Sequence, residues 1–572
     1  MAPLNTILLC TGAVFAVAAA QDPSVVTLPN GAVKGLVFST HRAFLGVPYG
    51  APPVGPLRWA PPVARAAWAP AVWDATADAP GCPQVCTEDE PPHICPPVAK
   101  QSEDCLFLNV FTPVAAPATP SPVLLFLHGG NFHDGYAGGY ALDGGLLYDG
   151  HEFVNTTGQI LLVVNYRLGA LGFLFAGGAS KNTTISGNFG LMDQVLAMEW
   201  ARANVGAFGG DPDRVTLIGQ SAGAMSISVH LTRPQTQGLY AGAIQHSNPF
   251  AEPWRSPPEA LAIAAGFANF TGCGADWISA ADWAPLEACL RGLDAPAIVA
   301  AAMSAELDLL ADLDAILQVV VAWGPTVGTD YLPLRPLEAF QRGLVNDVPI
   351  AIGTTANETV IFVYEVLDFP LPALLYEAAV ALLVSPEALP AVMALYPLPD
   401  PVPGDLRVFA SSVLTDALFL CPTRNATEAL LAAQPARRSK IYHYQYSHML
   451  SWANQAWGKN FTECDTEVCH GSDLPAWFMP RVSPAPGFGD YTQAELDLGH
   501  VWQRYWASFA ATGDPGAPAP NASSGGLAWP AYDVTSRPTM NLETADNGGL
   551  AIVPQLRADF CKFWDENGYR LY

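Results

Sequence analysis

The serine at position 221 stands in a pattern that can turn a hydroxyl into a nucleophile. Residues 219–223 read Gly-Gln-Ser-Ala-Gly, a G-x-S-x-G motif. The residues before it, 214–218 (RVTLI), are mostly apolar and β-branched and favour a buried strand, whereas 224–231 (AMSISVHL) contain no Gly or Pro and favour a helix. Flanking glycines allow a strand-to-helix turn so sharp that the serine hydroxyl stands exposed above the sheet. We therefore predict a nucleophilic Ser221.

A serine hydroxyl needs a neighbouring base, and that base needs an acidic group to hold its tautomer. Glu358 follows the strand-like run 348–353 (VPIAIG), so we expect it in a loop after a strand end, where open α/β sheets carry functional groups. His470 is the candidate base, although an isolated histidine is more often structural and an isolated loop glutamate is more often a solvated charge. Three other histidines compete for the role of base: His443, His448 and His500.

The chain also predicts donors for an oxyanion. Residues 124–135 (LLFLHGGNFHDG) form a strand-like run that leads into His-Gly-Gly. Loops of this composition present backbone N–H groups to a developing oxyanion, and each such donor typically contributes about 2.7–4 kcal/mol to the rate-limiting step. We expect the N–H groups of Gly130, Asn131 and Ala222 to serve in this way; the alternative is an ordinary strand-to-loop turn.

These residues need a sheet to hold them. Strand-like runs at 123–128, 160–164 and 215–219 alternate with helix-like segments such as 191–205. Near-continuous apolar strands between helices imply a parallel sheet that is covered on both faces. The region at about 255–430 is rich in Ala, Leu and Pro, and we interpret it as helices laid over this sheet.

Composition narrows the class of protein. No internal repeat or long linker divides the chain, so we expect one catalytic domain over residues 21–572. Hydrophobic residues make up 50% of the chain, which allows a large core and excludes wholesale disorder. A net charge of −26 argues against nucleic acid and anionic membranes as partners. The Cys and His residues lack zinc-finger and H-E-x-x-H spacing, so we predict no metal site.

The N-terminus predicts export. Residues 1–20 hold an apolar core and end in three alanines, which predicts a signal peptide cleaved before Gln21; an N-terminal anchor is the alternative. No later stretch is long and apolar enough to span a bilayer. Of eleven cysteines, Cys10 leaves with the signal, and the remaining even number suits a disulfide framework. Seven N-x-S/T sequons point the same way, and six are candidate glycosylation sites: Asn155, Asn182, Asn269, Asn425, Asn460 and Asn521.

Beyond these motifs, the chain resembles the type-B carboxylesterases, also called the cholinesterase/lipase family of α/β-hydrolases, over nearly its whole mature length. The resemblance is carried by 44–59 (FLGVPYGAPPVGPLRW), 102–113 (SEDCLFLNVFTP), 164–174 (VNYRLGALGFL), 187–194 (GNFGLMDQ), 208–224 (FGGDPDRVTLIGQSAGA), 469–475 (CHGSDLP), 506–515 (WASFAATGDP) and 561–565 (CKFWD). It implies the α/β-hydrolase fold, with a large mixed, mostly parallel central sheet and helices on both faces. The family's triad, matched position by position, falls on Ser221, Glu358 and His470.

The resemblance also implies an activity. It implies a secreted serine carboxylic-ester hydrolase that works through an acyl-enzyme, acts on a small-molecule or lipid ester, and needs no cofactor. Two alternatives stay open: a triacylglycerol lipase of the same family, and a non-catalytic adhesion or binding protein on this fold. The sequence leaves the natural substrate and the oligomeric state open.

Cross-links follow from the same resemblance. A Cys464–Cys469 bridge, already suggested by the local sequence, would fix the residue before His470. The implied disulfides are Cys82–Cys105, Cys86–Cys95, Cys273–Cys289 and Cys421–Cys561, although the four cysteines of the first loop allow three connectivities. Two ion pairs are implied as structural: Arg58 with Glu103, and Arg167 with Asp193.

Four positions depart from the family pattern. Asn131 stands where many members carry a third Gly, but Asn tolerates left-handed backbone well, so its N–H can still point into the site. Gln220 stands where cholinesterases usually carry Glu, which removes a negative charge beside the nucleophile. The loop 82–105 contains no Trp on which choline could stack, so we do not expect cholinesterase activity. Thr359 makes Asn357 a sequon, and we expect Asn357 to stay unmodified because a glycan there would obstruct the site.

Overall fold

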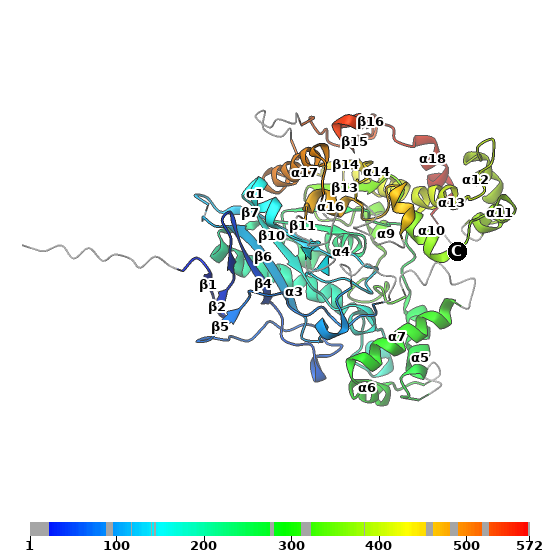
Figure 1. Ribbon diagram of the computed structural model, residues 1–572. Helices are drawn as coiled ribbons and strands as arrows, with labels where there is room; N and C mark the ends of the chain where they lie inside the picture. The colour runs from blue at the N-terminus through cyan, green and yellow to red at the C-terminus, as the bar shows by residue number, and fades with distance from the viewer. Residues whose placement is uncertain are drawn as a thin grey trace, which may run out of the picture.

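The computed structural model describes residues 22–569 apart from 87–94, 116, 139, 142–144, 275–279, 311–321, 382–383, 453–460, 481–489 and 517–525. The proposed signal peptide and the sequons at Asn460 and Asn521 therefore lie outside the described residues. At the centre is an eleven-stranded sheet with helices on both sides (Figure 1).

The sheet is mixed and mostly parallel. Its strands, in spatial order, are β16 (Ala551–Pro554), β15 (Pro538–Leu542), β14 (Ile441–Tyr446), β13 (Ile350–Thr355), β12 (Gly242–His246), β11 (Gly210–Gln220), β7 (Ser121–Leu127), β10 (Ile160–Val164), β6 (Phe107–Pro113), β4 (His41–Pro48) and β3 (Leu36–Val37). All neighbours from β15 to β10 pair in parallel, whereas the outer pairs on both sides are antiparallel. This arrangement confirms the predicted α/β-hydrolase fold.

Two smaller sheets and a set of helices complete the fold. The smaller sheets comprise β1 (Val25–Leu28), β2 (Gly31–Lys34) and β5 (Val72–Asp74), and β8 (Tyr140–Ala141) with β9 (Gly145–Leu146). The helices are α1 (His151–Thr157), α2 (Gly169–Phe173), α3 (Phe189–Asn204), α4 (Ala222–Leu231), α5 (Pro257–Phe270), α6 (Ala284–Arg291), α7 (Ala295–Leu310), α9 (Pro336–Gln341), α10 (Val360–Val366), α11 (Ala373–Ala381), α12 (Leu389–Leu395), α13 (Arg407–Leu414), α14 (Cys421–Ala433), α16 (Asp473–Phe478), α17 (Gln493–Thr512) and α18 (Ala558–Asn567).

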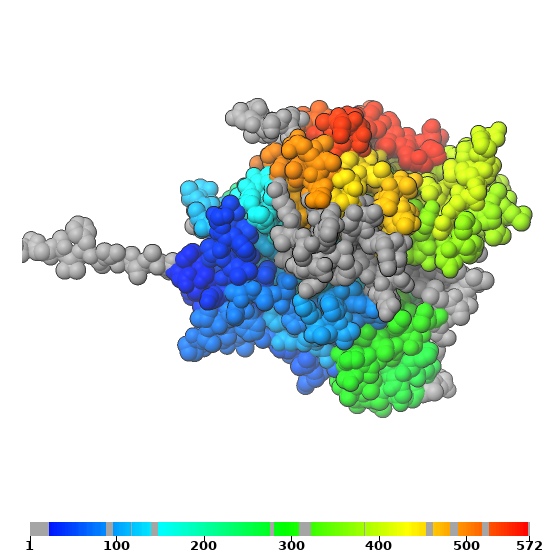
Figure 2. Space-filling model, viewed as in Figure 1, coloured from blue at the N-terminus to red at the C-terminus, as the bar shows by residue number. Residues whose placement is uncertain are grey.

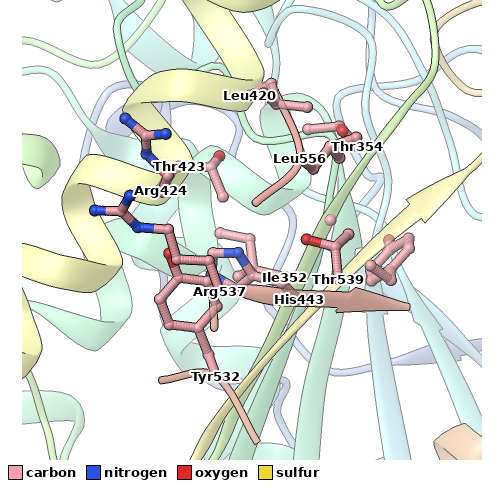
Figure 3. Close-up of a pocket in the computed structure, with 12 residues that line it drawn as sticks. Ile352, Thr354, Leu420, Thr423, Arg424, His443, Tyr532, Arg537, Thr539 and Leu556 are labelled. Carbon is pink, nitrogen blue, oxygen red and sulfur yellow. The ribbon is translucent and has the colours of Figure 1, made fainter. Parts of the chain in front are cut away.

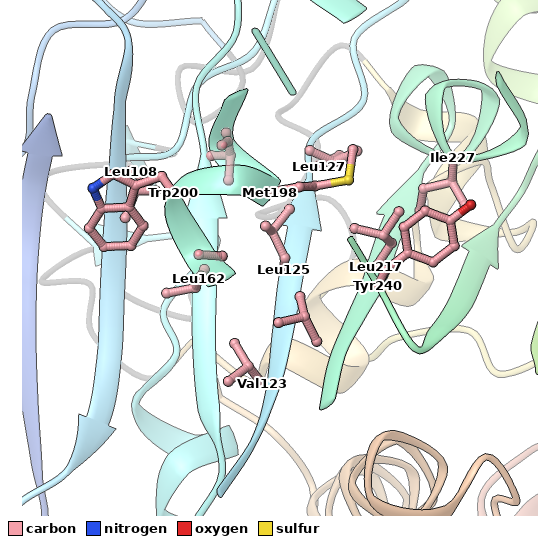
Figure 4. Packing of buried hydrophobic residues seen from close by; sticks show 14 of the residues in the cluster. Leu108, Val123, Leu125, Leu127, Leu162, Met198, Trp200, Leu217, Ile227 and Tyr240 are labelled. Carbon is pink, nitrogen blue, oxygen red and sulfur yellow. The ribbon is translucent and has the colours of Figure 1, made fainter. Parts of the chain in front are cut away.

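Both faces of the central strands are buried, which explains why these strands are apolar throughout. Successive side chains of a strand point to opposite faces. Leu125 of β7 packs on one face in a cluster with Met198 of α3 (Figure 4). Its neighbour Leu124 packs on the other face in a cluster with Trp502 of α17. Every residue of β7 and β10 is buried as a result, and the predicted coverage of both faces is confirmed.

The sequence predicted that the region at about 255–430 forms helices laid over the sheet, and the structure corrects this prediction. Most of these helices form two lobes, each with an apolar cluster of its own. Helices α5 to α7 pack with α2 and Trp59, and α11 to α13 pack with α18. Figure 2 shows the first lobe in green and the second in yellow-green, each at the rim of the molecule. Of this region, α9 and α14 do contribute side chains, such as Phe340 and Leu430, to the core over the sheet.

Five disulfides tie the loops and helices together. They join the same cysteines that the sequence and the resemblance imply: Cys82–Cys105, Cys86–Cys95, Cys273–Cys289, Cys421–Cys561 and Cys464–Cys469. The Cys421–Cys561 bond closes a span of 140 residues and holds α18 against α14. The two ion pairs are also present, with N–O distances of 2.6 Å for Arg58–Glu103 and 2.7 Å for Arg167–Asp193.

The sequons differ in accessibility. Asn155, Asn182 and Asn269 are exposed. Asn425 is half-buried, and its amide nitrogen donates to Asp565 at 3.0 Å. Asn357 is buried and its amide nitrogen donates to Glu467 at 3.0 Å, so a glycan there would need both burial and this bond to be undone. Among the described helices, none is both long and apolar enough to cross a membrane.

Candidate active site

Ser221 occupies a strained turn between a strand and a helix. Strand β11 ends at Gln220, α4 begins at Ala222, and Ser221 between them has φ 54° and ψ −122°. A Cβ atom on Gly223 would collide with the carbonyl oxygen of Leu127 in β7, which explains why glycine is needed at that position. The Ser221 N–H donates to the carbonyl of His246, the last residue of β12, at 2.9 Å. The neighbouring strand thus holds the backbone of the turn.

Glu358 and His470 are brought together by this fold. His470 Nδ1 lies 2.7 Å from Glu358 Oε2, and Glu358 Oε1 accepts from the Thr355 N–H at 2.7 Å, at the end of β13. The Glu358 side chain is completely buried and that of His470 is 10% exposed. A carboxylate at Nδ1 fixes the proton there and leaves Nε2 as the acceptor of the ring. The imidazole is therefore oriented as a base.

Gln220 makes a contact that the sequence did not predict. Its amide nitrogen lies 3.0 Å from His470 Nε2, so the amide donates to the lone pair that a base would use. In the described part of the chain, the Ser221 hydroxyl and His470 do not share a hydrogen bond. Catalytic hydrogen bonds are often long in unliganded enzymes and tighten when substrate binds. In this structure the His470 ring is held by Gln220.

The His-Gly-Gly loop packs directly against the turn at Ser221. Gly129 has no room for a side chain, because a Cβ atom there would contact the Gln220 side chain and the Ser221 Cβ. Asn131 adopts φ 50°, the left-handed conformation anticipated for it. Among the described residues, the backbone N–H groups of Gly130, Asn131 and Ala222 donate to no protein acceptor. They are therefore free to bind an oxygen atom of a ligand.

Two histidines support this loop in different protonation states. Burial lowers the pKa of His128 to about 4, despite its hydrogen bond to the Gly129 carbonyl, and its ring stacks on Tyr166 at 4.4 Å between centroids. Burial also lowers the pKa of His133, but the carboxylates of Asp134 and Glu306 outweigh it and raise the pKa to about 10. His133 Nε2 lies 3.3 Å from Glu306 Oε2, which connects the loop to α7. The sequence offered no signal for this connection.

The three other candidate histidines are hydrogen-bonded to other side chains. His443 Nε2 lies 2.8 Å from Thr427 Oγ1, His448 Nδ1 lies 2.7 Å from Glu543 Oε1, and His500 Nε2 lies 2.7 Å from Glu152 Oε1. His443 borders the pocket drawn in Figure 3, whose lining contains neither Ser221 nor His470. Only His470, of the four candidates, adjoins Glu358 and the Ser221 turn.

Two residues at the free N–H groups belong to the hydrophobic core. Ala222 and Phe132, the neighbour of Asn131, pack in a buried cluster with Met225, Trp254 and Leu332. The cluster continues with Tyr166, Leu168, Phe173, Leu191 and Val229. Within the described residues, no group of three or more His, Cys, Asp and Glu side chains could hold a metal ion.

Comparison with known proteins defines the class to which this fold and site belong. Residues 22–564 match the model of the carboxylesterase family, so the chain belongs to the carboxylesterase family. It is 33% identical over 529 residues to the cAMP-regulated D2 protein of Dictyostelium discoideum (91% of this chain, 89% of that protein) and 34% identical over 494 residues to the crystal protein of the same organism (86% and 82%). It is also 31% identical over 530 residues to the para-nitrobenzyl esterase of Bacillus subtilis strain 168 (91% and 95%).

Proposed function

We propose that this member of the carboxylesterase family is a secreted serine ester hydrolase with a Ser221–His470–Glu358 triad. The observation that carries the proposal is the 2.7 Å bond between buried Glu358 and His470, made beside the strained turn that presents Ser221. A buried carboxylate is costly unless it is hydrogen-bonded, and Glu358 is bonded both to the Thr355 N–H and to the His470 ring. A nucleophilic serine requires a base, and a carboxylate beside the imidazole orients that base.

We assign the steps of the reaction to these residues as follows. His470 Nε2 releases the Gln220 amide and accepts the Ser221 proton, and Ser221 Oγ attacks the ester carbonyl. The N–H groups of Gly130, Asn131 and Ala222 receive the negative charge on the carbonyl oxygen. His470 then gives its proton to the leaving alcohol, and Glu358 stabilises the imidazolium in between. Water hydrolyses the acyl-enzyme by the same sequence.

Two features support an extracellular location. Five disulfides suit an oxidising compartment. The predicted signal peptide agrees with this location.

A series of p-nitrophenyl esters from acetate to palmitate tests the proposal, with the wild type and Ser221→Ala. We expect Ser221→Ala to lose at least about 1,000-fold in kcat. Ser247→Ala is the matched control, because Ser247 is also buried and also has φ 54°. Equal loss in both variants, or activity that survives in Ser221→Ala, contradicts the mechanism. A rise in rate toward palmitate at an oil–water interface would identify a lipase, and no turnover by the wild type would identify a binding protein.

A further inference from the structure

Another pair of a carboxylate and an imidazole lies next to the backbone of the candidate active site. His246 Nδ1 and Asp473 Oδ2 are 2.6 Å apart, and their side chains are 0% and 1% exposed. Burying such a pair is expensive, and replacing one by well-packed apolar residues is often neutral or even stabilising. The free energy of folding therefore does not explain why this pair is present. Its contacts with the candidate active site indicate another role.

The two partners are attached to the two halves of the site. His246 ends β12, and its carbonyl oxygen accepts the Ser221 N–H at 2.9 Å. Asp473 begins α16, three residues after His470. Two short backbone bonds make the intervening turn compact: Ser472 N–H to the Cys469 carbonyl at 3.1 Å, and Leu474 N–H to the Gly471 carbonyl at 2.8 Å. The pair thus links the backbone that holds Ser221 to the turn that carries His470.

The surroundings of His246 fix its ring. Trp477 and Trp502 stack on the imidazole with centroids 5.9 Å away, and Trp506 and Tyr444 meet it edge-on at 5.5 and 5.6 Å. His246 Nε2 is buried and has no hydrogen-bond partner among the described residues. The bond to Asp473 is therefore the polar contact that orients the ring.

We propose that the His246–Asp473 pair is a positioning device that sets the distance between Ser221 and His470 for catalysis. This inference rests on the proposed function. His470 must move from Gln220 to Ser221, so a small error in the relative placement of the two backbones would reach the reacting atoms directly. A misplacement of about 1 Å can cost on the order of 100-fold in rate.

The test separates the rate per active site from the number of active sites. Wild type and Asp473→Asn are titrated with a fluorophosphonate to count reactive serines, and kcat for p-nitrophenyl acetate is expressed per titrated site. We expect Asp473→Asn to lower kcat per site at least tenfold with KM changed less than twofold. Glu152→Gln is the control, because it also removes the carboxylate from a histidine pair of 2.7 Å, made with His500. We expect this variant to keep kcat per site unchanged.

A double variant, His246→Leu with Asp473→Leu, avoids leaving one polar partner buried alone. It should fold and show the same tenfold or greater loss per site. A merely structural role would instead reduce the number of titrated sites and preserve kcat per site, and that result in either variant overturns the proposal. Failure of both variants to fold would also assign the pair to stability and overturn it. A wild type without a titratable serine would refute the proposed function itself.

Discussion

The Glu358–His470 bond yields the sharpest prediction for the triad. In Glu358→Gln the side-chain oxygen can still accept from the Thr355 N–H, which lies 2.7 Å from the carboxylate. The new NH₂ group then faces His470 Nδ1 and donates to it. The ring proton must move to Nε2, and the imidazole can no longer accept a proton from Ser221.

The size of the loss can be bounded from this geometry. A hydrogen bond to a charged group is worth about 1.5–3 kcal/mol, so loss of the carboxylate charge alone lowers kcat by about 10- to 150-fold. Holding the wrong tautomer costs on the order of 10⁴-fold in a serine protease triad. Because Glu358 is completely buried, water cannot take its place, and we expect a loss between about 10² and 10⁴.

Steady-state hydrolysis of p-nitrophenyl acetate measures this effect. Glu543→Gln is the control, since Glu543 also bonds a histidine, His448, at 2.7 Å but lies outside the candidate triad. A folded Glu358→Gln enzyme that keeps kcat within about threefold of the wild type would refute the role of Glu358. An equal loss in Glu543→Gln would show that the effect is structural.

Three further outcomes follow from the structure. Gln220→Met removes the amide that donates to His470 Nε2, so the phosphonylation rate of the nucleophile should rise about 3- to 10-fold, the worth of a hydrogen bond of about 1 kcal/mol; an unchanged or slower rate would contradict this. Burial lowers the pKa of His448, but its two carboxylate partners outweigh it and raise the pKa to about 9, so its stabilisation is complete below about pH 6.5 and disappears as the pH rises through about 9. The melting-temperature gap between wild type and His448→Gln should close over that range, and a gap independent of pH would refute it. Replacing Cys421 and Cys561 by Ser opens a span of 140 residues and should destabilise the protein by up to about 5 kcal/mol, read from the denaturation midpoint; no shift would contradict it.

The sequence predicted the parts of the site that depend on local pattern. The β-branched run before Ser221 and the Gly- and Pro-free run after it became β11 and α4. Glu358 lies in the loop after β13, as its position after VPIAIG suggested. These elements could be predicted because strand propensity, turn glycines and helix propensity all act within a few residues.

Other features depend on contacts between distant parts of the chain, and no local pattern announces them. Gln220 and His470 are 250 residues apart, and His246 and Asp473 are 227 apart. The lobes formed by α5–α7 and α11–α13 were expected over the sheet, because Ala- and Leu-rich helices look alike whether they cover a sheet or one another. Which apolar faces meet is decided by tertiary packing.

The central claim, that Ser221 is the nucleophile of an ester hydrolase, is tested most directly by labelling the intact protein with a fluorophosphonate. Mass spectrometry of the protein and its peptides locates the adduct while p-nitrophenyl acetate hydrolysis is followed. We predict one phosphonyl group per chain, on the peptide that contains Ser221, with hydrolysis lost in proportion to labelling. Hydrolysis that persists after Ser221 is fully labelled, or an adduct on another residue that abolishes it, would contradict the account.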